Sequence, residues 1–144
     1  LMTDSGTEMS VHFDAATSRW IAVYGAPGPP RRDSPSTIWI RSANRLEGPW
    51  SAPYPLFVTP ETIEIPTSPI DPNLFCYAGK AHPEFAEPGN LLVTYVCNLF
   101  ARSDEEAPKI LRRLLASPDL YRPRVISLPI PSGIATHRPE SEMR

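Results

Sequence analysis

Two segments of the sequence carry polar side chains at alternate positions, and these side chains are of the types that act on or bind sugars. In the first segment they are Glu8, Ser10 and His12, and in the second they are Lys80, His82 and Glu84. Residues two apart lie on one face of a β-strand, so each set would line one surface. A carboxyl group placed on such a surface can act as an acid, a base or a nucleophile. Glu8 is therefore our candidate catalytic residue; the alternative is a solvated carboxylate on a half-exposed strand.

The candidate substrate-binding residues are polar groups near the ends of predicted strands. His82, beside Glu84, can bind sugar hydroxyls or hydrogen-bond to the backbone. Lys80 and Arg122 can contact an anionic sugar or be surface charges, and Asn98 follows an apolar run. We predict that these five side chains bind the substrate.

Two tyrosines offer a second way to bind a sugar. Tyr77 and Tyr95 can each stack on a sugar ring or pack in the core. The tryptophans Trp20, Trp39 and Trp50 have apolar neighbours, which favours packing for all three.

Other chemistries lack their residue patterns. His12, His82 and His137 show no metal-ligand spacing with one another, and the two cysteines form no C-x-x-C pair. The sequence contains neither a G-x-S-x-G nucleophile motif nor a G-x-x-x-x-G-K-[ST] phosphate loop. We predict no bound metal and no cofactor.

Charge and composition argue against two classes of partner. The net charge is −2 and there is no basic block, so we expect no nucleic acid. No apolar run approaches the roughly 18 residues that cross a bilayer, so we expect no membrane contact. The 19 prolines stand between aromatic and β-branched runs, which predicts short strands with rigid connections.

The predicted elements form two similar units. The first has strands at 7–13, 20–24, 36–42 and 54–58, and the second, after a proline-rich connection at 59–73, has strands at 75–85, 91–97 and 120–128. A short helix is expected at 109–116, where Leu, Arg and Lys are frequent. Nothing in 131–144 suggests packing, so we predict a disordered tail there.

Cys76 and Cys97 would face each other if the segment between them forms a hairpin turning near 86–89. We expect two free, buried thiols. The alternative is a cross-strand disulfide, which would suit a secreted protein.

Several motifs carry a resemblance to a known family. Segments 7–11 (TEMSV), 19–24 (RWIAVY), 40–43 (IRSA) and 46–51 (LEGPWS) resemble a blade of the five-bladed β-propellers of the glycoside-hydrolase-like superfamily, which contains arabinanases and xylosidases. Segments 81–84 (AHPE) and 92–98 (LVTYVCN) resemble the last blade of its DUF4185-like branch. In this superfamily the G-P-W-S sequence marks the turn between the third and fourth strands of a blade.

The resemblance implies an all-β fold made of about two antiparallel four-stranded blades, at 1–58 and 74–130. A propeller closes with about 4–8 blades, so the chain would be the C-terminal part of a longer, secreted parent. That parent would hydrolyse glycosidic bonds in a polysaccharide or oligosaccharide, and its remaining blades would be partners of this part. The superfamily's catalytic acids lie mainly on the first three blades, so the chain alone would be inactive. The alternative is a non-catalytic glycan-binding or structural propeller module.

Overall fold

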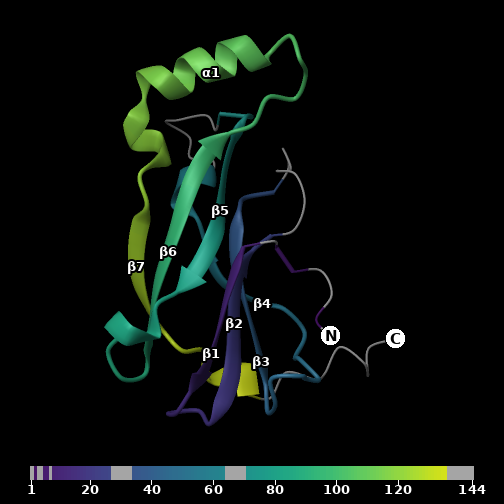
Figure 1. Cartoon of the computed structure of the whole chain (residues 1–144), viewed down its shortest axis with the longest axis vertical. Helices are drawn as coiled ribbons and strands as arrows, with labels where there is room; N and C mark the ends of the chain where they lie inside the picture. Colours follow the sequence, from purple (N-terminus) through teal and green to yellow (C-terminus); the bar gives the residue numbers. More distant parts are fainter. Residues whose placement is uncertain (1, 3–4, 7, 27–33, 64–70, 136–144) are drawn as a thin grey trace.

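Alternating and continuous apolar runs of the chain form seven β-strands in two antiparallel sheets, with one α-helix beyond one end of the second sheet (Figure 1). The computed structural model describes residues 2, 5–6, 8–26, 34–63 and 71–135. The first sheet has the order β1-β2-β3-β4, with bounds Met9–Asp14, Arg19–Gly25, Thr37–Ala43 and Tyr54–Val58. The second has the order β5-β6-β7, with bounds Leu74–Ala81, Asn90–Leu99 and Arg124–Pro129. The helix α1 spans Ala107–Ala116, and four short 3₁₀ helices are η1 Pro60–Thr62, η2 Pro83–Phe85, η3 Pro118–Tyr121 and η4 Ser132–Ala135.

The all-β prediction is confirmed, and the four strands of the first unit lie close to their predicted positions. The second sheet has three strands within the described residues, one in each of the three segments predicted from the pattern, whereas the resemblance implied a four-stranded blade. The chain between β6 and β7 forms α1 and η3, and α1 confirms the helix predicted at 109–116. Neither sheet closes on itself in the described part of the chain, so the propeller remains a proposal.

The G-P-W-S turn lies between β3 and β4, where the motif predicts it. Gly48 has a φ of 95°, a left-handed conformation that favours glycine, and the Gly48–Pro49 peptide is cis. Ser51 closes the turn, because its N–H donates to the Ser42 carbonyl at 2.8 Å and its hydroxyl accepts from the Ser42 N–H at 3.1 Å. Trp50 is buried, as predicted for a packing residue. The motif thus forms the turn that leads from β3 towards β4.

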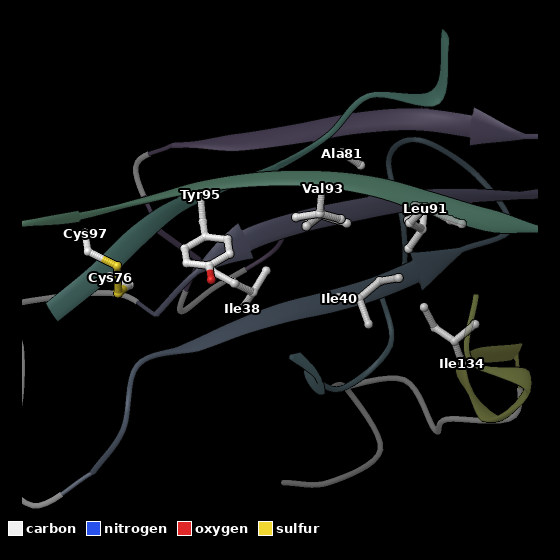
Figure 2. Packing of buried hydrophobic residues seen from close by; sticks show 11 residues of the cluster. Ile38, Ile40, Cys76, Ala81, Leu91, Val93, Tyr95, Cys97 and Ile134 are labelled. Atoms are coloured by element: carbon white, nitrogen blue, oxygen red, sulfur yellow. A yellow bond between two sulfur atoms is a disulfide. The ribbon is translucent and has the colours of Figure 1, made fainter. Parts of the chain in front are cut away.

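The main core lies between the two sheets. Figure 2 shows Ile38 and Ile40 of β3 opposite Val93 and Tyr95 of β6, with the Cys76–Cys97 disulfide at one end. Because strand residues alternate between faces, every second residue of β6 is buried. Ile134 of η4 is 1% exposed and fills the other end of this core.

Serine hydroxyls of the first unit accept hydrogen bonds from backbone N–H groups of β5, an edge strand of the second sheet. The Cys76 N–H donates to Ser36 Oγ at 2.9 Å, and the Ala81 N–H donates to Ser10 Oγ at 2.7 Å. These N–H groups on β5 have no neighbouring strand of their own sheet on that side, and an unpaired edge is an aggregation hazard. The two hydroxyls therefore link β5 to the first unit.

Polar and apolar residues alternate along β1 as predicted. However, the polar face of this strand, and not the apolar face, is turned to the second sheet. Ser10 points to the second sheet, where it bonds β5. Val11 and Phe13 lie on the other face and are 40% and 51% exposed. The reason is that β5 passes close to β1 and offers N–H groups that need polar partners.

The predicted disordered tail begins too early. Residues 132–135 form η4, and the Ser42 hydroxyl donates to the Ile134 carbonyl at 2.9 Å. Sequence reasoning missed this because a single buried isoleucine produces no periodic pattern. The rest of that prediction, 136–144, lies outside the described residues, as does His137.

The expectation of two free thiols is wrong, and the alternative holds. Cys76 and Cys97 are directly opposite in the register of β5 and β6 and form a disulfide, with Cα atoms 4.0 Å apart. The Cys76 N–H bonds Ser36 and not β6, so this is a non-hydrogen-bonded pair, in which side chains lie closest.

Candidate functional site

The outward face of the second sheet carries a row of aromatic rings. Phe75 and Tyr77 point away from the core because they flank the core-facing Cys76 on β5. Their rings stack with centroids 4.9 Å apart and an interplanar angle of 20°. Phe100, just after β6, meets Phe75 edge-on at 6.3 Å. Tyr121 of η3 completes the set, and we call Phe75, Tyr77, Phe100 and Tyr121 the aromatic row.

Polar groups lie at the Tyr77 end of the aromatic row. The Tyr77 hydroxyl donates to the Tyr121 hydroxyl at 3.3 Å, and it also hydrogen-bonds the Asn98 side chain. Burial and the bond with Tyr121 raise the pKa of Tyr77, and the negative charge of Glu8 raises it further. The row thus combines apolar ring surface with two hydroxyls and an amide.

The structure places one of the predicted site residues, Asn98, at the aromatic row. Asn98 is opposite Phe75 in the strand register, on the same face as the aromatic row. Glu8 is exposed, directly before β1, and acts electrostatically on Tyr77. Tyr77 itself lies on the exposed face, as the stacking alternative requires, whereas Tyr95 is 3% exposed and belongs to the core.

The other predicted substrate-binding residues lie elsewhere. Lys80 is exposed on β5 beyond a register shift that begins after Tyr77. His82 follows the strand, with its Nε2 2.8 Å from the Thr94 hydroxyl and its Nδ1 3.7 Å from a Glu84 oxygen. Arg122 pairs with Asp119 at 2.7 Å on the surface, next to Tyr121 in sequence.

The predicted strand 75–85 is too long, which changes the setting of Glu84. β5 ends at Ala81, and Glu84 lies in η2. Pro83 has no N–H to continue the ladder and instead begins the 3₁₀ helix. The expected strand face of Lys80, His82 and Glu84 is therefore not formed as one surface.

His12 lies on the face of β1 that is turned to the second sheet. Its Nδ1 is buried and has no hydrogen-bond partner among the described atoms. Burial lowers the pKa of His12, and the carboxylates of Asp14 and Glu84 oppose that shift.

A second polar cluster lies beside the disulfide. The Tyr95 hydroxyl donates to both Glu61 oxygens at 3.2 Å, and Arg124 Nε pairs with Glu61 Oε1 at 2.5 Å. Burial raises the pKa of Tyr95 to about 12, and Glu61 adds to the shift. In the described ranges, Glu61, Cys76 and Cys97 are the one group of three metal-ligating residue types close enough to share an ion.

Sequence reasoning missed most of the aromatic row, and it missed Glu61 and Arg124 of this second cluster. Phe75 precedes the core-facing Cys76, so strand periodicity could have predicted that its ring lies on the outward face. Tyr121 and Glu61 lie in 3₁₀ segments, and their hydrogen-bond partners Tyr77 and Tyr95 are 44 and 34 positions away in the sequence. No local sequence pattern predicts contacts between residues so far apart.

Comparison with known proteins adds no relative: no family model, no curated protein and no solved structure matches this chain. Over the described residues, no helix is long and apolar enough to span a bilayer.

Proposed function

We propose that this chain binds a polysaccharide or oligosaccharide at the aromatic row, as part of a carbohydrate-active β-propeller. The observation that carries this proposal is the pairing, on the outward face of the second sheet, of half-buried stacked rings with hydroxyl and amide groups. Sugar rings have apolar faces edged by hydroxyls, so a surface that binds them combines aromatic rings with a few placed polar groups. Tyr77, Tyr121 and Asn98 supply both kinds of contact.

The propeller part of the proposal rests on topology. The strands β1 to β4 follow one another in an antiparallel meander, as in a blade. The edge strands β1 and β5 are joined through Ser10 and Ala81, as adjacent inner strands of two blades would be. Val11 and Phe13 leave an exposed apolar area on the outer face of β1, which a further blade would cover.

Binding is tested by titrating the chain with arabino- and xylo-oligosaccharides in a calorimeter. We expect Tyr77→Ala to weaken binding at least tenfold, about 1.4 kcal/mol, because it removes both a ring face and a hydroxyl. Phe85→Ala is the matched control, since Phe85 is 73% exposed in η2 and outside the aromatic row. Absence of binding to every oligosaccharide, or equal losses in both variants, would refute the proposal.

Glycosidic cleavage is the second candidate, and it is favoured by the charge of Glu8, which contributes to the raised pKa of Tyr77. A carboxylate next to a sugar platform can act as an acid, a base or a nucleophile. The test is turnover of aryl arabinosides and xylosides by the wild-type chain and by Glu8→Gln. A rate above the uncatalysed one that falls at least 100-fold in the variant supports the role; an unchanged rate removes Glu8 from the reaction.

The requirement for further blades is tested by a thermal melt followed by near-UV circular dichroism, which reports fixed aromatic packing. We expect a broad transition, because the outer face of β1 is uncovered. A sharp transition that does not depend on concentration would show that the chain is self-sufficient and would count against additional blades.

A further inference from the structure

The disulfide and its neighbours contain the ligand types of a zinc site. Cys76 and Cys97 lie opposite each other on β5 and β6, facing the core. Glu61, from η1, extends to the same place, and one ligand atom from each of the three residues lies within 4.8 Å of the other two. η1 contacts β5, so the carboxylate is held beside the strand pair by the fold.

We propose that reduction of the Cys76–Cys97 disulfide creates a zinc site in which the two thiolates and the Glu61 carboxylate bind one ion. The fourth position of the tetrahedron is taken by water. This inference does not depend on sugar binding, because none of the three residues belongs to the aromatic row.

The strand geometry suits two sulfur ligands on one ion. A Zn–S bond is about 2.3 Å, so tetrahedral geometry places two sulfurs about 3.8 Å apart. The Cα atoms of the two cysteines are 4.0 Å apart and their side chains share one face of the hairpin. Once the S–S bond is broken, side-chain rotation alone can bring the sulfurs to that separation.

The charges of the cluster balance around a divalent cation. Two thiolates and Glu61 carry −3, the ion carries +2, and Arg124, paired with Glu61, carries +1. The sum is zero, which matters because an unbalanced charge in the core is costly.

The surroundings also orient the third ligand and leave it accessible. The Tyr95 hydroxyl donates to Glu61, an outer-shell bond of the kind that fixes a ligating carboxylate. The Glu61 side chain is 24% exposed, whereas Cys97 is fully buried, so an ion enters from the Glu61 side.

The reaction that opens the site balances with a phosphine reductant. The phosphine attacks one sulfur and breaks the S–S bond; water then hydrolyses the phosphonium, giving two thiols and the phosphine oxide. Binding of zinc releases the two thiol protons.

The test uses the full chain, reduced with a phosphine, and titrated with Co²⁺ and Zn²⁺. We expect one ion per chain, a thiolate-to-cobalt charge-transfer band, and displacement of cobalt by zinc. The oxidised chain and the double variant Cys76→Ser, Cys97→Ser should show no band. Glu61→Gln should weaken zinc binding at least tenfold, whereas the control Glu47→Gln, an exposed surface carboxylate, should leave it unchanged.

Three results would overturn the proposal. The first is no ion bound to a reduced chain that keeps its near-UV circular dichroism. The second is a reduced chain that loses this signal and does not recover it with zinc. The third is equal affinity in the wild type and Glu61→Gln, which would mean that the thiols bind metal without the folded arrangement.

Discussion

Replacing Ile134 with alanine tests whether the chain after β7 is part of the core. Ile134 is 1% exposed and lies beside Ile40 and Leu91 at one end of the inter-sheet core (Figure 2). Truncating a buried isoleucine to alanine costs about 2–5 kcal/mol, through lost transfer free energy and the cavity that remains. We expect about 2–3 kcal/mol, because η4 is a single short 3₁₀ helix that can shift to reduce the cavity.

The assay is urea denaturation followed by tryptophan fluorescence, with the free energy of unfolding extrapolated to water. Leu115→Ala is the control: it removes a similar volume from a side chain that is 75% exposed on α1, and it should change stability by no more than about 0.5 kcal/mol. Equal stabilities of Ile134→Ala and the wild type would refute the placement of η4 in the core.

Two further predictions concern the contact between the sheets and the cluster at Glu61. Gly79→Ala should destabilise the chain by about 1–3 kcal/mol in the same urea assay, because a Cβ there would lie 2.7 Å from Ile38 Cγ2. The control is Gly133→Ala, where nothing lies within 4 Å of the added carbon, and it should change stability by less than about 0.5 kcal/mol. Equal effects of the two substitutions would contradict the close approach of β5 to the first sheet. The pKa of Tyr95 is raised to about 12 by burial and by Glu61, so the folded state holds the phenol proton more tightly than the unfolded chain, whose tyrosines titrate near 10. Stability should therefore fall as the pH rises from about 10 to 12, and Tyr95→Phe should lose less stability over that interval; identical pH profiles would refute the Tyr95–Glu61 contact.

The strands of this chain could be predicted because their signals are local. Trp20 to Tyr24 form a continuous apolar run, and β2 is the strand covered on both faces. The alternation in Leu91 to Cys97 gave β6, and Gly48-Pro49 gave the turn after β3. Each of these features depends on residues within a few positions of one another, where sequence spacing and spatial spacing agree.

The candidate site was predicted in part. Asn98 was chosen from its position near a strand end, and the fold brings it to Tyr77, whereas Glu8 was chosen from the polar alternation of the first strand. Lys80 and His82 were grouped with Glu84 by alternation, but the register shift after Tyr77 and the proline at 83 break that alternation. A rule of period two holds only while the ladder is regular.

The sequence by itself therefore determined which segments are strands and where the main turns lie. Tertiary structure decided which face of β1 meets the second sheet, that Cys76 and Cys97 are joined, and that Ile134 belongs to the core. Those outcomes depend on contacts between residues up to 92 positions apart, as in the Ser42–Ile134 hydrogen bond. The physical reason is that backbone pairing and side-chain periodicity are set locally, whereas burial and charge pairing are set by whichever distant segment packs alongside.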